Sequence, residues 1–298
     1  MAARRKKKGG VASALVAVIV IVILVLYNQF VGFGGERATE VVEGTVEIYI
    51  FDVGQADCTL IRSEAGNILI DAGDTDTQSE IVEMVRTAGA TELEYVIFTH
   101  PDSDHIGGAD EIVNGFDIKN IILPEIDESD IPTTKVYENM IAAIEAKESI
   151  NVIAAVSGTE YIIGELKMKL LAPNSDNYSN INDYSVAARF DFGATSFLFT
   201  GDALETSEKE MLATYPASEL KCTFFQAGHH GAANANTPDF IKAVSPEIVA
   251  VSCGKDNKYG HPTSSALEAY ASVGATVYRT DELGTIVFTS DGTTVTKK

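Results

Sequence analysis

The sequence predicts one α/β domain over residues 46–298, with mixed sheets and helices outside them, preceded by a single N-terminal transmembrane helix. Three observations predict this arrangement. Short β-rich runs alternate with amphipathic helical stretches, no linker or repeat interrupts them, and a long uncharged apolar run stands near the start. A chain of 298 residues that is 45% hydrophobic is long enough to bury a sizeable core.

The elements begin with hairpin-like strands and then alternate. We expect strands at Val46–Phe51, Cys58–Ile61, Ile68–Ile70, Tyr95–Thr99, Asn120–Leu123, Val152–Val156, Leu166–Leu171, Ala187–Phe192, Ser196–Thr200, Cys222–Phe225, Ile248–Ser252, Thr276–Arg279 and Thr285–Thr289. We expect helices at Ser79–Thr87, Val136–Ala146, Leu204–Thr214, Asp239–Val244 and Ser264–Ser272. Residues 174–183 form a polar loop.

The N-terminal region predicts a membrane anchor. Residues 1–10 hold five bases, and the uncharged stretch Val11–Tyr27 reaches roughly 25 Å as a helix. With the apolar residues up to 33 it approaches the hydrocarbon thickness of about 30 Å, so we expect a span at 11–33 and a linker at 34–45. A buried core helix and a cleaved signal peptide are the alternatives, but no Ala-x-Ala-like site follows. The bases place the N-terminus in the cytoplasm and the domain at 46–298 outside the cell.

The charge balance limits the possible partners. The chain has 22 basic and 43 acidic residues, and removing the five N-terminal bases leaves 17 bases and a net charge of −26. A body this acidic offers no broad basic surface for nucleic acid. Any phosphodiester substrate must therefore be held locally, by bound cations or by a few placed bases.

The three cysteines are Cys58, Cys222 and Cys253, each beside strand-like apolar residues. We expect small buried hydrophobic residues, and one disulfide with one free thiol stays open as the alternative. No Cys-x-x-Cys pair exists, which argues against a thiolate zinc site.

The chemistry is concentrated around the histidines. His100 follows the strand Tyr95–Thr99 and opens the segment His-Pro-Asp-Ser-Asp-His-Ile-Gly-Gly, so two imidazoles and two carboxylates stand within six residues. A loop at a strand end can turn these side chains into one cavity, while the two glycines let the backbone pass close by. Imidazole and carboxylate together suit Zn²⁺, Mn²⁺ or Fe, so we expect a metal site here.

Other polar residues also stand at the ends of expected strands, beside Gly or Pro. They are Asp71, Asp202, His229, His230 and His261. Each alone is compatible with a loop cap or a surface residue. Because α/β sheets build their sites at such strand ends, the set together predicts one site.

These motifs resemble a known family. Phe51–Asp57 (Phe-Asp-Val-Gly-Gln-Ala-Asp), Leu-Ile-Asp-Ala-Gly at 69–73, the segment at 99–108, Thr-Gly-Asp at 200–202, His-His-Gly at 229–231 and Tyr-Gly-His-Pro at 259–262 look like the metallo-β-lactamase-fold hydrolases. The similarity covers about residues 46–290 and is greatest to the lactamase-like domain of ComEC-type competence proteins. It implies an αββα sandwich with two divalent metal ions, Zn or Mn, at one edge.

The resemblance also implies roles for individual residues. His100 and Asp102 would bind one metal, Asp104 and His105 the other, with Asp202 bridging them and His261 as a late histidine ligand. Asp104, His229 and His230 would be catalytic, one of the two adjacent histidines serving as a ligand or general acid and the other supporting it. Asp71 would orient the metal loop. Apart from the resemblance, Asn182, Ser185 and Lys255 are candidate phosphate contacts, and an ordinary loop residue is the alternative for each.

The sequence departs from the family at several points. A histidine usual between the second motif and Thr-Gly-Asp is absent, and Asn-Asp-Tyr-Ser stands at 182–185 in its place. The usual His-His-Gly-Ser ends in Ala232. The multi-span channel and small barrel of competence proteins are not in this sequence, so we do not expect it to form a DNA channel.

The leading hypothesis is a membrane-anchored extracellular phosphodiesterase, with a nuclease acting on DNA as its narrower form. Two ions would lower the pKa of a shared water so that hydroxide attacks the phosphoryl group at neutral pH. A second hypothesis keeps the site but takes a cell-envelope phosphodiester such as a phosphocholine-bearing teichoic acid. A third is a non-catalytic surface binding module on the same fold.

Overall fold

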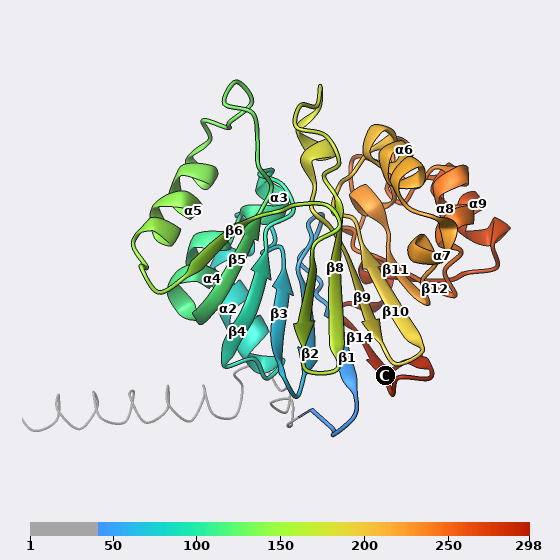
Figure 1. The fold of residues 1–298 in the computed structure, drawn as a ribbon, viewed down its shortest axis with the longest axis horizontal. Helices are drawn as coiled ribbons and strands as arrows, with labels where there is room; N and C mark the ends of the chain where they lie inside the picture. Colours follow the sequence, from blue (N-terminus) through green and yellow to red (C-terminus); the bar gives the residue numbers. More distant parts are fainter. Residues whose placement is uncertain (1–40) are drawn as a thin grey trace, which may run out of the picture. The chain divides into compact units, whose positions relative to one another are not determined.

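The computed structural model describes residues 41–298, and the span predicted at 11–33 and most of the linker lie outside them. The described part contains two β-sheets with helices on their outer faces (Figure 1). Within 41–298, no helix combines the length and the apolar character needed to cross a bilayer. The predicted order of layers, helix–sheet–sheet–helix, is confirmed.

The first sheet has eight strands in the order β15-β14-β1-β2-β3-β4-β5-β6. Their bounds are β1 Val46–Ile50, β2 Thr59–Ser63, β3 Gly66–Ile70, β4 Glu92–Ile97, β5 Asp117–Leu123, β6 Asn151–Ala154, β14 Ile286–Ser290 and β15 Val295–Lys297. Strands β1, β2 and β3 form an antiparallel meander, and β3 to β6 run parallel. The carboxyl ends of β3 and β4 therefore meet at one edge.

The second sheet has seven strands in the order β13-β12-β11-β10-β9-β8-β7. Their bounds are β7 Glu160–Ile163, β8 Leu166–Ala172, β9 Ala187–Phe192, β10 Thr195–Phe199, β11 Phe224–Gln226, β12 Ile248–Val251 and β13 Thr276–Arg279. Strands β10 to β13 are parallel, so the loops that follow β10, β11 and β12 also share one edge.

The helices lie on the two outer faces and at the connections. They are α2 Gln78–Thr87, α3 Ser103–Ile106, α4 Ala109–Gly115, α5 Lys135–Glu145, α6 Glu205–Thr214, α7 Ala217–Leu220, α8 Pro238–Val244, α9 Ser264–Ser272 and α10 Thr280–Leu283, with short 3₁₀ turns at Ile181–Tyr184 and Gly228–Gly231. Helix α2 is amphipathic, because its buried residues Ile81 and Val85 lie one turn apart and face the first sheet. Helix α5 begins where the Thr134 hydroxyl accepts a hydrogen bond from Tyr137 N.

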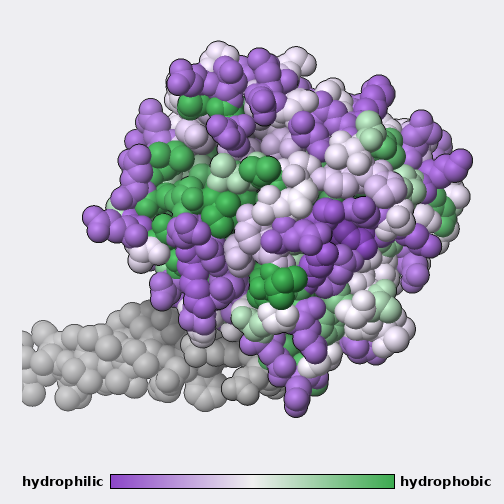
Figure 2. All heavy atoms as spheres, in the orientation of Figure 1, coloured by the Kyte–Doolittle hydropathy of each residue, from purple (hydrophilic) through white to green (hydrophobic). Residues whose placement is uncertain are grey.

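Three hydrophobic clusters hold the layers together. One lies between the first sheet and α2, α4 and α5, one between the two sheets, and one between the second sheet and α6, α8 and α9. The middle cluster is rich in aromatic rings, with Phe224 and Phe288 at a centroid distance of 5.0 Å. The face in Figure 2 is largely hydrophilic with separate hydrophobic areas, as the acidic composition leads one to expect.

The three cysteines are free and buried, which confirms the expectation of small hydrophobic core residues. Short elements escaped the sequence prediction, namely α3, α4, α7, α10, β7 and β15. Strand β7 is an edge strand whose Ile162 is 71% exposed, so it lacks the buried alternation that identifies a strand.

Candidate metal centre

The segment after β4 is folded so that its polar side chains converge. His100 lies three residues past the end of β4, and α3 begins at Ser103, with His105 N donating to Asp102 O at 3.0 Å. The turn packs tightly against the loop after β3. A Cβ on Gly107 would lie 2.2 Å from the carbonyl carbon of Asp74, so this close approach of two backbones requires glycine.

Four groups from three distant segments form the main cluster. One atom each of Asp104, His105, Asp202 and His230 lies within 4.8 Å of the others. His105 Nε2 is 3.1 Å from Asp202 Oδ1, and His230 Nε2 is 3.2 Å from Asp104 Oδ2. Two imidazoles and two carboxylates at this spacing match the donor types that divalent transition metals prefer.

The other oxygen of Asp202 faces a second set of side chains. Its Oδ2 lies 3.5 Å from His229 Nε2 and 4.0 Å from His100 Nε2. His100 Nε2 is in turn 3.6 Å from Asp102 Oδ2. Asp202 therefore stands between the main cluster and a second group of possible ligands, as a bridging carboxylate would.

The cluster is electrostatically coupled. Burial lowers the pKa of His105 and of His230. The negative charge of Asp202 opposes this effect at both rings, aided by Asp71 at His105 and by Asp57 at His230. The pKa of each ring is therefore raised well above its ordinary value. Burial also opposes ionisation of Asp202, yet His105 and His230 hold its pKa well below the usual range. A divalent cation bound here would replace protons on the two rings, so metal binding is linked to proton release.

Asp104 behaves in the same way. Burial would raise the pKa of its carboxyl, but the hydrogen bond from His230 and the nearby His105 lower it to about 2. The carboxylate is therefore ionised throughout the physiological range, as a metal ligand must be.

Two buried aspartates orient the histidines from behind. Asp71 Oδ2 lies 2.8 Å from His105 Nδ1, and its carboxylate also accepts from Thr99 N and Thr99 Oγ1 at 2.8 and 2.7 Å. His230 Nδ1 has the Ser252 carbonyl oxygen as its hydrogen-bond partner at 3.1 Å, and Asp57 Oδ1 lies 3.2 Å from the same nitrogen. A carboxylate on Nδ1 fixes the ring with Nε2 free to face a metal.

The turn carrying His229 and His230 is held in an uncommon backbone shape. Both residues are in the left-handed region, with φ of 48° and 54°. The buried Asn236 side chain holds this turn, because its amide accepts from Gly228 N at 3.0 Å and donates to Gly228 O at 2.8 Å. The turn thereby directs the two neighbouring rings to different places.

Several buried polar atoms in this region have no hydrogen-bond partner in residues 41–298. They include His100 Nε2, His105 Nε2, His229 Nδ1 and Asp202 Oδ1. Unpaired buried donors and acceptors are costly, and three of these atoms face Asp202 or belong to it. The donor set therefore fits a bound divalent metal.

Comparison with known proteins agrees with this geometry. A family model described as the Metallo-beta-lactamase superfamily matches residues 51–165, which include the segment from His100 to His105. The crystal structure of the metallo-beta-lactamase fold protein YhfI from Bacillus subtilis superposes with a TM-score of 0.54 at 12% identity, covering 83% of this chain and 99% of that one. This is a metallo-β-lactamase-fold protein.

Similar curated proteins include one named as a competence protein and one named as a product of the ComE operon. ComE operon protein 3 of Bacillus subtilis is 27% identical over 81% of this chain and 33% of its own length. Competence protein ComA of Neisseria gonorrhoeae is 27% identical over 86% of this chain and 34% of its own length. The chain thus spans about a third of the length of these relatives, and the resemblance to the lactamase-like domain of competence proteins is confirmed.

The metallo-β-lactamase fold brings most of the predicted site residues together. His100, Asp102, Asp104, His105, Asp202, His229 and His230 surround the centre. The adjacent histidines differ: His230 is in the main cluster, while His229 faces Asp202 Oδ2 and is partly exposed. His261 is not in the main cluster. Its ring lies 5.6 Å from that of His229, and its predicted role as a ligand stays a prediction.

The three residues predicted to contact phosphate differ in their exposure to solvent. Lys255 is exposed, and Asn182 is 8% exposed in the 3₁₀ turn Ile181–Tyr184. Ser185 is fully buried, and its Oγ accepts from Asp202 N at 3.1 Å. This contact makes Ser185 a support for the Asp202 loop and leaves its predicted phosphate contact without support from the fold.

Two supporting groups were missed from the sequence. Asp57 stands in the Phe51–Asp57 motif, but nothing in a single sequence shows that it reaches His230, 173 positions later. Asn236 lies in a polar stretch without a motif. Its backbone is left-handed, with a φ of 60°, a conformation that asparagine tolerates, but the sequence does not show that this residue adopts it.

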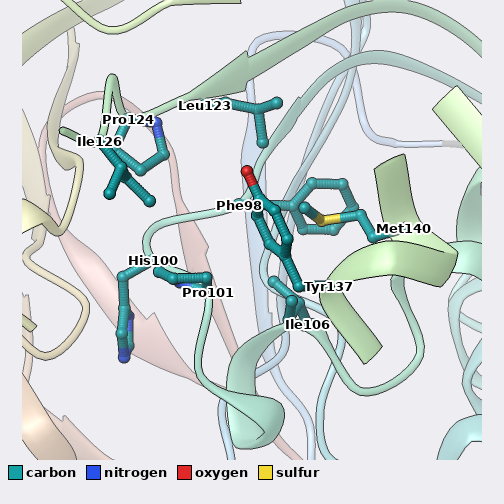
Figure 3. Close-up of a pocket in the computed structure, with 9 residues that line it drawn as sticks. All are labelled: Phe98, His100, Pro101, Ile106, Leu123, Pro124, Ile126, Tyr137 and Met140. Carbon is teal, nitrogen blue, oxygen red and sulfur yellow. The ribbon is translucent and has the colours of Figure 1, made fainter. Parts of the chain in front are cut away.

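A small apolar pocket adjoins the centre behind His100. It is lined by Phe98, His100, Pro101, Ile106, Leu123, Pro124, Ile126, Tyr137 and Met140. In Figure 3 the imidazole of His100 lies at the edge of this mainly apolar group. The pocket gives the first histidine of the motif an apolar backing, which limits water on that side.

Proposed function

We propose that this protein is a metal-dependent hydrolase that cleaves phosphodiesters, with a nuclease as the narrower form. The observation that carries the proposal is the convergence of Asp104, His105, Asp202 and His230. His100 and His229 lie near the other oxygen of Asp202, and Asp102 lies beside His100. Mixed nitrogen and oxygen donors suit Zn²⁺ or Mn²⁺.

The main cluster would hold one ion, and His100 and Asp102 would hold a second one, with Asp202 shared, while His229 stays free to move a proton. Divalent cations so held supply Lewis acidity toward a phosphoryl oxygen and make water a better nucleophile at neutral pH. Asp71 and Asp57 lie on Nδ1 of His105 and His230, so Nε2 is the atom of each ring that would exchange its proton for the cation.

Among the histidines around the site, His229 is placed to exchange a proton with substrate. Its side chain is 23% exposed, whereas those of His100, His105 and His230 are at most 2% exposed. His261 next to it does not serve as an acid, because burial and the neighbouring His229 and His230 lower its pKa to about 4. His261 is thus neutral at pH 7, and His229 is the candidate to protonate the leaving oxygen.

The acidic surface supports a local mode of substrate binding. A net charge of −26 outside the N-terminal bases repels polyanions at a distance, so attraction must come from the centre itself. We also propose that residues 11–33 anchor the chain with residues 46–298 outside the cell. Protease treatment of intact cells should then digest the domain.

The test is hydrolysis of methyl p-nitrophenyl phosphate and of labelled DNA by the full chain, after chelation and after return of Zn²⁺ or Mn²⁺. We expect turnover only with metal, and loss of turnover in Asp104→Asn and Asp202→Asn. Asp74→Asn is the matched control and keeps activity, because Asp74 is a half-buried aspartate in the turn after β3 that bonds to Thr75. No hydrolysis of any diester with any metal would reject the proposal.

A further inference from the structure

The loop from Gly254 to His261, which follows β12, is held in a fixed shape beside the centre. The Asn257 side chain closes it, donating to Gly254 O at 2.9 Å and to His261 O at 2.6 Å and accepting from His261 N at 3.0 Å. At its base, Gly254 N donates to Gln55 Oε1 at 3.0 Å. Side chains on this loop are therefore presented in defined positions.

The loop exposes an aromatic ring that is linked to the centre by other rings. Tyr259 is 57% exposed, and its ring stacks on that of His261 with centroids 5.6 Å apart and planes at 27°. His261 meets His229 edge-on at 5.6 Å, and His229 lies 3.5 Å from Asp202. A row of three rings thus leads from Asp202 to solvent.

The same loop carries two lysines. Lys255 and Lys258 are exposed, and neither makes an ion pair within the described chain from residue 41 onward. Lys258 Nζ lies 4.9 Å from the centroid of the Tyr259 ring, and Asp256 stands between the two lysines. In so acidic a domain, unpaired lysines beside the centre suit an anionic group of a substrate.

We propose that Tyr259 stacks a nucleobase of a single-stranded nucleic acid, while Lys255 and Lys258 hold the neighbouring backbone phosphates. The inference rests on the proposed function and names its substrate class. An exposed ring with adjacent cations is the combination that binds single strands without sequence preference. Bases in a duplex are already stacked, so the subsite requires unpaired bases.

The same geometry disfavours a phosphocholine headgroup. A quaternary ammonium would also be attracted to an aromatic face. At Tyr259, however, it would meet the ammonium of Lys258, which lies 4.9 Å from the ring centroid. A neutral base with an attached phosphate avoids this repulsion, so the loop selects nucleotides.

The experiment compares two oligomers on the full chain loaded with Mn²⁺. One is a single-stranded phosphorothioate oligothymidine, and the other has the same length and charge but abasic sites throughout; both resist cleavage. Tyr259→Ala should weaken binding of the base-bearing oligomer about fivefold or more and leave the abasic oligomer unchanged. Tyr259→Phe, which keeps the ring, should bind both oligomers as the wild type does.

The lysine variants give the complementary result. Lys255→Ala and Lys258→Ala should weaken both oligomers alike and reduce the salt dependence of binding. Equal losses for both oligomers in Tyr259→Ala, no loss for either, or competition by phosphocholine but not by thymidine monophosphate would overturn the inference. Hydrolysis of methyl p-nitrophenyl phosphate, which has no base, reports on the proposed function separately.

Discussion

Replacing Asp71 by asparagine should weaken metal binding without touching a proposed ligand. The carboxylate accepts three hydrogen bonds or close contacts at 2.7 to 2.8 Å, two from Thr99 and one from His105 Nδ1. Asparagine has the same shape, but one of its two terminal atoms is a donor. If its oxygen keeps the bond from Thr99 N, its NH₂ group faces His105 Nδ1.

That NH₂ group favours the wrong tautomer of His105. Nδ1 would have to accept, so the ring proton would move to Nε2, the atom that lies 3.1 Å from Asp202 Oδ1. A protonated Nε2 cannot bind a cation. Loss of a supporting partner of this kind costs about 10- to 100-fold in metal affinity, or about 1.4 to 2.8 kcal/mol.

The assay is competition between the protein and a chromophoric chelator for Zn²⁺ or Mn²⁺. Asp74→Asn is the control, since Asp74 stands in the same loop but bonds only to the neighbouring turn. Far-UV circular dichroism of both variants checks that they are folded. A folded Asp71→Asn protein that binds metal as tightly as the control would refute the reasoning.

Three further outcomes are expected. Burial raises the pKa of Glu208 to about 7 from an ordinary 4.5, so between these values the folded state holds a proton that the unfolded state has lost. The free energy of unfolding should then fall by up to about 3 kcal/mol as pH rises from 4.5 to 7, and Glu208→Gln should flatten this slope in urea titrations. His230→Asn should reduce metal affinity about tenfold or more, as measured by chelator competition. His261→Asn should leave the metal affinity of the main cluster unchanged in the same assay. Phe224→Ala, fully buried between the sheets, should cost about 3 to 5 kcal/mol in the free energy of unfolding.

The order of elements could be predicted because each long element carries its own signal. The expected bounds of Ala187–Phe192, Ser264–Ser272 and Thr276–Arg279 agree with those observed. Helices α3 and α4 were missed because Gly107 and Gly108 interrupt them, and a Gly pair in a polar segment normally indicates a loop. Here Gly107 allows close packing against the backbone of Asp74, and Gly108 allows it against Ala72 O and Ile81.

The candidate centre was predictable as a set but not in its detailed arrangement. Asp104, His105, Asp202 and His230 all follow the ends of strands and lie together, as expected where parallel strands place their carboxyl ends at one edge. The division between His229 and His230 could not be predicted, since it depends on two left-handed residues held by Asn236. Ser185 contacts the backbone N–H of Asp202 and not the centre itself, and no sequence pattern specifies this contact.

Anomalous diffraction from crystals soaked in Zn²⁺ or Mn²⁺ tests the central claim most directly. The account predicts a peak about 2.0 to 2.3 Å from donor atoms of Asp104, His105, Asp202 and His230, with a second peak on the His100 side of Asp202. Metal bound only elsewhere, while His105 and His230 stay paired to Asp202 and Asp104, would contradict it.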